Sequence, residues 1–114
     1  MKLFSFKKQK QQAVFVFRIE HIFSIRDIGT AVAGIVLNGS AGIGDVVSFG
    51  HVPGDTVFSC NIKAIHGKSS IEGGIGPVER ATADGPCCYG CSLILDEPDC
   101  SRFHVGECLF IPQK

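Results

Sequence analysis

Apolar and polar positions alternate between Ala13 and Ile25. The odd positions carry Ala, Phe, Phe, Ile, His, Phe and Ile, whereas the even positions include Arg18, Glu20 and Ser24. A period of two residues is typical of a strand with one buried face, so the pattern predicts one long strand over residues 13–25. His21 falls on the apolar side of this pattern. We interpret it as a neutral, hydrogen-bonded histidine in a core or at a barrel end, in preference to a ligand or a base.

The next segments are short apolar runs separated by glycines. Glycines occupy positions 29, 34, 39, 42 and 44 between runs rich in Val, Ile and Ala, and the pair Asn38-Gly39 is a strong signal for a tight hairpin turn. Residues 57–65 again alternate, with apolar side chains on the even positions and Asn61 and Lys63 among the odd ones. Short strands joined by sharp reversals predict a small antiparallel barrel.

The spacing of these glycines is also particular. Gly29-Thr30 is followed by Gly34, Gly39 and Gly44-Asp45, and the segment resembles the second domain of translational GTPases such as elongation factor Tu, which reads IEDVFSI, GTVVTGRV and a VGE turn. A weaker match continues to VGECLFIP, so that the resemblance covers residues 15–112. The matching positions are Ile19, Glu20, Ile22, Phe23, Ser24, Ile25, Gly29, Thr30, Val32, Gly34, Val36, Gly39, Ile43, Gly44, Asp45, Ile62, Ile65, Tyr89 and Gly90.

The resemblance implies an all-β fold, a six-stranded antiparallel Greek-key barrel like domain 2 of the elongation factors. A chain of 114 residues that is 45% apolar suffices for one such core. We expect a basic N-terminal arm without fixed structure at 1–12 and a single barrel domain at 13–112, with an extended loop at 66–86 and no substantial helix. The strands are expected near residues 13–25, 30–38, 45–50, 56–65, 88–95 and 107–112.

The formal charge of zero is unevenly distributed. The first twelve residues hold four lysines and no acid, whereas the rest of the chain holds seven basic and eleven acidic side chains. The arm is therefore the part whose charge suits a polyanion, and Lys7, Lys8 and Lys10 are the candidate RNA contacts. A solubilising end, or an anionic membrane surface met by Phe4 and Phe6, are the alternatives.

No apolar stretch near the N-terminus has the length of a secretory signal or of a membrane span. We therefore expect a cytoplasmic protein whose cysteines remain thiols.

Residues 66–86 form a glycine-rich segment that is longer than an ordinary barrel connection and longer than its counterpart in the Tu-like factors. An added segment is an economical place for a function of this protein's own, so His66, Lys68, Glu72 and Arg80 are candidate partner-binding residues. The alternative is a tolerated surface excursion, because loop length costs little free energy.

The sequence CCYGC, with Cys87, Cys88 and Cys91, raises the question of a zinc or redox site. The family alignment places residues 88–95 on a strand, where Cys87 and Cys91 would lie roughly 13 Å apart at about 3.3 Å per residue. Zinc requires its thiolates within about 2.3 Å of one ion. A bulge at Gly90 is the geometry that would bring thiols together. We expect small buried hydrophobic side chains, with no metal and no cofactor.

Two further motifs bear on catalysis. The glycines of SAGIGD at 40–45 are not followed by Lys-Ser/Thr and a helix, so the segment does not predict a phosphate loop, and we expect neither GTP binding nor hydrolysis. Asp96, Glu97 and Asp99 precede the last strand, and we interpret them as a solvated tip without catalytic function.

Two classes of function remain. The resemblance implies a non-catalytic, RNA- or ribosome-associated module, because in the Tu-like factors this barrel docks on ribosomal RNA and transfer RNA. An arginine that there helps to hold the aminoacyl end of transfer RNA has no counterpart in residues 92–95 here, which removes the case for that contact. The alternative is a protein–protein interaction or self-associating module unrelated to translation, which the acidic body and the added loop favour.

Overall fold

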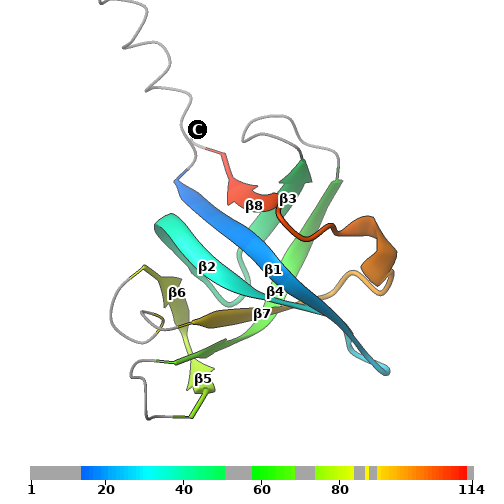
Figure 1. Ribbon diagram of the computed structural model, residues 1–114, viewed down its shortest axis with the longest axis horizontal. Coiled ribbons are helices and arrows are strands. Elements are labelled where there is room, and N and C mark those ends of the chain that lie inside the picture. Colours follow the sequence, from blue (N-terminus) through cyan, green and yellow to red (C-terminus); the bar gives the residue numbers. More distant parts are fainter. Residues whose placement is uncertain (1–13, 51–57, 69–73, 84–86, 88–89, 113–114) are drawn as a thin grey trace, which may run out of the picture.

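The computed structural model describes residues 14–50, 58–68, 74–83, 87 and 90–112. This part of the chain is almost entirely β, with the short 3-10 turn η2 (Cys100–Arg102) before the last strand (Figure 1). The arm predicted at 1–12 lies outside the described residues. The strands are β1 (Phe15–Ile25), β2 (Gly29–Gly42), β3 (Val46–Gly50), β4 (Phe58–Gly67), β5 (Gly76–Val78), β6 (Arg80–Thr82), β7 (Cys91–Leu95) and β8 (Cys108–Ile111).

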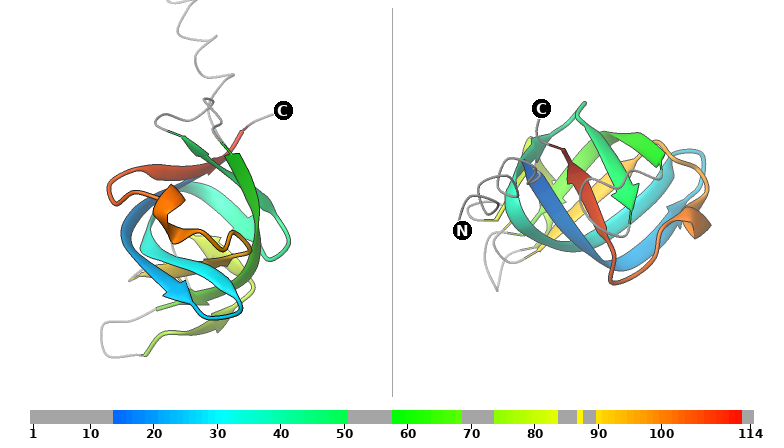
Figure 2. Two further views of the ribbon diagram at one scale, coloured as in Figure 1. Left: turned by 90° about the vertical axis from the view of Figure 1, so that its right-hand side faces the viewer. Right: turned by 90° about the horizontal axis from the view of Figure 1, so that it is seen from above.

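Six of these strands close into a barrel, seen from two further sides in Figure 2. Antiparallel pairing runs through β1, β8, β3, β4, β7 and β2, and β2 pairs back with β1. Among the six barrel strands, β3, β4 and β7 follow one another in the sequence and lie side by side. The last strand, β8, returns to lie beside β3, which gives a Greek-key order. The six-stranded Greek-key barrel predicted from the sequence is confirmed.

Alternate side chains of these strands fill the barrel. Phe15, Phe17 and Ile19 of β1 are fully buried, as are Leu93 and Leu95 of β7. Each such side chain contributes about 2 to 3 kcal/mol when it leaves water, so the interior supplies most of the driving force for closure.

β1 departs from the predicted alternation at Glu20. The register with β2 shifts between Ile19 and His21, where β1 carries one residue more than its partner. A bulge of this kind exchanges the two faces of the strand that follows. Ile22 therefore packs against the core, whereas Phe23 is 55% exposed and His21 is exposed. The interpretation of His21 as a core histidine was wrong, because the bulge turns it outward.

The segment 66–86 carries two short strands where the sequence predicted a loop. β5 pairs with the end of β4, Ile65 opposite Val78, and β6 pairs with the end of β2, Ala41 opposite Ala81. Both alanines are fully buried. Small side chains on the two strands let β6 lie close on β2, so the described part of this segment extends two edges of the barrel.

Candidate functional site

Arg80 of β6 lies at the surface between two hollows. They have volumes of about 510 Å³ and 390 Å³, and Arg80 lines both. We call the larger one the Arg80 hollow. Its lining residues are Val14, Ser40, Gly44, Asp45, Val46, Arg80 and Ile111.

Local contacts hold the Arg80 side chain against β2. Its Nη2 donates to Ser40 Oγ at 3.0 Å. A Cβ at Gly42 would lie 2.7 Å from Arg80 Nη1, so any larger residue there would displace the guanidinium. Asp45 turns its carboxylate inward to accept a hydrogen bond from Gly42 N at 2.8 Å. The hollow is thus lined by the Arg80 guanidinium and by the Asp45 carboxylate, which accepts a hydrogen bond from the backbone of Gly42.

The rim of the Arg80 hollow is also where the described chain begins. Val14 lines the hollow, and its N–H donates to Ile111 O at 2.8 Å, which fixes it beside β8. The predicted RNA contacts Lys7, Lys8 and Lys10 lie outside the described residues. In the sequence Val14 follows Lys10 by four residues.

The structure does not bring all the predicted partner-binding residues to this hollow. His66 stands on β4 between Pro77 of β5 and Ser92 of β7. Lys68 follows β4, and its N–H donates to Gly90 O at 3.0 Å. These two residues lie at the β4–β7 edge, whereas Arg80 contacts β2. Glu72 lies outside the described residues.

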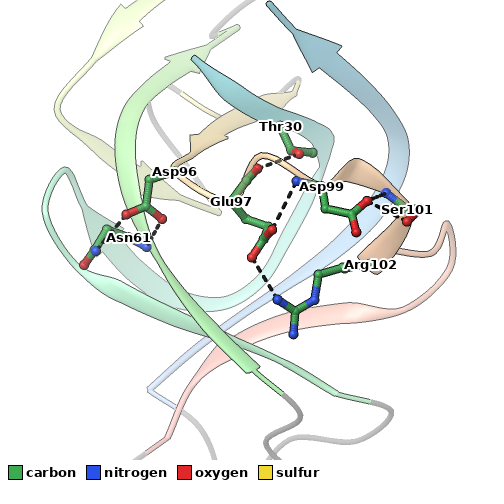
Figure 3. A network of polar contacts seen from close by, with 7 residues as sticks. All are labelled: Thr30, Asn61, Asp96, Glu97, Asp99, Ser101 and Arg102. Carbon is green, nitrogen blue, oxygen red and sulfur yellow. Dashed lines mark hydrogen bonds and ion pairs between the residues drawn. The ribbon is translucent and has the colours of Figure 1, made fainter. Parts of the chain in front are cut away.

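A second polar group lies on the connection from β7 to β8, which in Figure 2 crosses one end of the barrel. Asp96 accepts hydrogen bonds from Asn61 N at 2.8 Å and from Asn61 Nδ2 at 2.9 Å (Figure 3). These hydrogen bonds from Asn61 hold the pKa of the Asp96 carboxyl below its ordinary value. Asp96 is therefore an ionised structural acceptor that ties β7 to β4.

The remaining acids of this connection are engaged as well. Glu97 pairs with Arg102 Nη1 at 3.1 Å, and its backbone oxygen accepts from Thr30 Oγ1 at 2.8 Å. Asp99 caps η2 through Ser101 N at 3.0 Å, and the hydrogen bonds from Ser101 lower the pKa of its carboxyl. Asp96 and Asp99 are exposed, as the predicted solvated tip requires, whereas the Glu97 side chain is only 14% exposed beneath its ion pair with Arg102, so the prediction was wrong for Glu97. Each of the three acids stabilises the loop through a hydrogen bond or ion pair.

An aromatic cluster under this loop had no signal in the sequence. The Arg102 guanidinium lies 3.9 Å from the centroid of the Phe58 ring. Phe58 meets Phe103 at 5.3 Å between centroids, and Phe103 meets Phe49 edge-on at 5.5 Å. The rings come from β3, β4 and the last loop, so only closure of the barrel assembles them.

The cysteines differ from expectation at one point. The chain turns between Cys87 and Cys91, with Gly90 N donating to Cys87 O at 3.1 Å and Gly90 at φ +151°, so β7 begins only at Cys91. Burial raises the pKa of the Cys91 thiol, and a side-chain hydrogen bond with Cys87 raises it further. The predicted separation of roughly 13 Å was wrong, because an extended strand was assumed across the turn.

Cys87 and Cys91 are nevertheless buried free thiols, as is Cys60, whereas Cys88 lies outside the described residues. In the part of the chain that the structure describes, no three side chains of His, Cys, Asp or Glu are grouped to hold a metal ion. The same residues include no helix of the length and apolarity needed to cross a membrane.

Comparison with known proteins gives structural matches only. No protein-family model and no curated protein matches the sequence. A bacterial selenocysteine-specific elongation factor, EF-Sec, superposes with a TM-score of 0.62 at 18% identity over 95% of this chain and 16% of its own. The apo form of translation elongation factor SelB from Methanococcus maripaludis gives 0.65 at 19% identity, over 90% of this chain and 19% of its own.

The chain thus spans under a fifth of the length of these factors. At such identities the similarity establishes the fold. It confirms the β-barrel fold that the resemblance to the elongation factors implied.

Proposed function

We propose that this barrel is a non-catalytic, cytoplasmic binding module that associates with RNA of the translation machinery, ribosomal or transfer RNA. The observation that supports the proposal is the position of Val14 and Arg80 on one hollow. Val14 follows the lysines of the arm in the sequence by a few residues, so we expect those lysines to act together with Arg80 on one polyanion. The two matched structures are translation elongation factors, which makes this class of partner the first to test.

The charge distribution sets the strength of such binding. The chain after residue 12 carries an excess of acids, so RNA would contact the arm and Arg80 in preference to the rest of the barrel. Each phosphate neutralised on a single strand contributes about −0.7 to the slope of log K against log salt. Four lysines and Arg80 predict a slope of roughly −3 to −4, with weak and sequence-tolerant affinity.

The absence of a catalytic function is part of the proposal. Hydrogen bonds that stabilise the loop lower the pKa of the Asp96 and Asp99 carboxyls. A carboxyl that is held ionised in this way is a poor general acid. We therefore expect no GTP hydrolysis. Isothermal titration of the protein with GTP tests the associated lack of nucleotide binding, and micromolar affinity would contradict it.

Fluorescence anisotropy with labelled single-stranded RNA over a salt series tests RNA binding directly. Replacing Lys7, Lys8 and Lys10 by Gln together should reduce the slope by about 2, and Arg80→Gln by about 0.7. Arg26→Gln is the matched control, because Arg26 follows the end of β1 opposite to Val14 and should leave the slope unchanged. Binding without salt dependence, or an equal effect of Arg26→Gln, would contradict the proposal.

A second candidate is a protein-binding module. Ile43 and Val46, which line the two hollows beside Arg80, are 53% and 51% exposed. Exposed apolar side chains beside an arginine are typical of protein interfaces. A pull-down from native cytosol with and without nuclease separates the candidates: ribosomal particles that are lost after nuclease treatment support RNA, and a stoichiometric protein that survives it supports this alternative.

A further inference from the structure

The outer half of β1 has one free edge among the described residues. β8 pairs with β1 only over Phe15–Arg18, and the last contact beyond it is the pair of hydrogen bonds that Ile19 makes with Gly106 and Glu107. From Glu20 to Ile25 the strand that pairs with β1 in the described part is β2 alone, and the β7–β8 connection approaches β1 without pairing with it, through η2 and through Pro98, which lines a hollow with Ser24 and Ile25. In Figure 1 this half of the β1–β2 hairpin projects from the barrel at the lower right.

The backbone groups at this edge follow from the ladder. Ile19 directs its N–H and C=O away from β2, and the extra residue at Glu20 shifts the alternation by one. At the far end, Ile25 O accepts from Ile28 N inside the hairpin turn and so faces β2. Counting the alternation from either end of this segment, the N–H and C=O groups of Ile22 and Ser24 point away from β2.

The bulge gives the same segment an apolar outer face. His21 and Phe23 stack on that face at 6.3 Å between ring centroids, and Ile25 follows them on it. Open edges with apolar side chains are templates for another strand, and folded proteins usually cover or charge them. This edge has charges at its two ends only, Glu20 at one and Arg26 at the other.

That charge order is self-complementary. We propose that two copies of this chain pair antiparallel through residues 20–26 of β1, about a two-fold axis at Phe23. Ile22 then lies opposite Ser24 of the second copy, so their outward N–H and C=O groups bond reciprocally. At both ends of the paired segment Glu20 lies opposite Arg26 of the second copy.

The side chains fit this register as well. Phe23 meets Phe23 of the second copy in a non-hydrogen-bonded pair, the position where opposite side chains approach closest. His21 lies beside Ile25 of the second copy on the same face. Glu20 pairs within its own chain with Arg18 at 3.2 Å and is 40% exposed, so its carboxylate remains open to a second guanidinium. The inference is independent of RNA binding, which involves the opposite end of β1.

Reversing the charge of Glu20 or of Arg26 tests the proposed register. A misfolded variant would not regain association when the two variants are mixed, whereas a change in charge pairing would. Sedimentation velocity of the full chain, from micromolar to millimolar protein at low salt, should show a concentration-dependent dimer. Glu20→Lys and Arg26→Glu should each weaken self-association by about tenfold or more, because each places like charges together at both ends. Mixed in equal amounts, the two variants should associate as the wild type does, because the mixed dimer restores opposite charges at both ends.

Backbone probes test the hydrogen bonds. Ser24→Pro removes an outward N–H and should abolish the dimer, whereas Ser24→Ala keeps that N–H and should not. In native hydrogen exchange the amides of Ile22 and Ser24 should become protected as concentration rises. The amides of His21 and Phe23, which face β2, should be protected throughout.

A wild-type protein that stays monomeric at millimolar concentration would overturn the proposal and leave the edge to an extended segment of another protein. A dimer that both single variants retain, or single variants that fail to associate when mixed, would overturn this register. Thermal unfolding of each variant at low protein concentration shows whether its barrel is intact, so that a lost dimer can be assigned to the interface and not to unfolding.

Discussion

Gly34 of β2 lies against the carbonyl oxygen of Arg18 on β1 so closely that a Cβ at position 34 would clash with it. The contact lies beside the bulge at Glu20, whose backbone nitrogen would lie 3.2 Å from such a Cβ. Glycine at this position thus permits the close approach of β1 and β2 that closes the barrel.

Replacing Gly34 by Ala should destabilise the protein by roughly 3 kcal/mol or more, because the atoms in the way are backbone and the strands must separate. Urea unfolding followed by circular dichroism measures the change. Gly74→Ala is the control: a Cβ there meets nothing within 4 Å, and the substitution should change stability by less than about 1 kcal/mol. Equal effects at the two positions would refute the contact.

The bulge makes opposite predictions for two phenylalanines of one strand. Phe17 is fully buried and Phe23 is 55% exposed. Phe17→Ala should cost about 3 to 5 kcal/mol, whereas Phe23→Ala should cost less than about 1 kcal/mol in dilute solution. Thermal unfolding at low protein concentration compares them, with Phe17→Leu in reserve if Phe17→Ala does not fold. An unbroken alternation along β1 would instead make the two substitutions equally costly.

Acid should weaken the tie between Asp96 and Asn61. The folded-state pKa of Asp96 lies below its ordinary value of 3.8 because of hydrogen bonds from Asn61. A lowered pKa stabilises the folded state above the unfolded-state value, and that stabilisation is lost as pH falls from about 4 through the folded-state value. Asp96→Asn should therefore cost about 1 kcal/mol at neutral pH and progressively less below pH 4.

Urea unfolding over a pH series measures this convergence of wild type and variant. Asp27→Asn is the matched control. Asp27 has φ +64° in the hairpin turn, a conformation that asparagine also tolerates, so the substitution itself should cost little stability. A cost of Asp96→Asn that stays constant down to strong acid would contradict the prediction.

Alkali should act through Cys60. Burial, followed by the nearby carboxylates of Asp96 and Glu97, raises the pKa of the Cys60 thiol from 9.0 to about 12. A raised pKa stabilises the folded state fully below the unfolded-state value, and this stabilisation is lost as pH rises from about 9 towards 12. Stability should fall across that window, and Cys60→Ala should make the fall shallower.

Alkylation with iodoacetamide, read by mass spectrometry, offers a second measurement of Cys60. At pH 8 the native protein should react at the half-buried Cys100 well before the buried Cys60, because the thiolate is the reactive form. In denaturant the two should react at similar rates. Early labelling of Cys60 in the native protein would mean that its thiol is open to solvent.

The sequence by itself determined the class of fold. Period-two alternation at 13–25 and 57–65 specifies strands through local geometry, since successive side chains of a strand point to opposite faces. Gly34 marks a close strand approach. The tight turn predicted at Asn38-Gly39 was wrong, because β2 continues through both residues to Gly42, and Gly39 pairs with Phe15 at φ +72° within the ladder. Such signals depend on residues that are close in the sequence, so they can be recognised without knowing which strands pair in the folded protein.

Tertiary structure alone decided which residues meet. The bulge at Glu20 depends on how β1 fits both β2 and β8, and it exchanged the faces of His21 and Phe23 against the alternation. Likewise Val14 and Arg80 come together because β6 pairs with β2 while β1 pairs with β8. The alternation of a single strand favours one register but does not reveal a bulge, because the extra residue is accommodated by packing between strands that are distant in sequence.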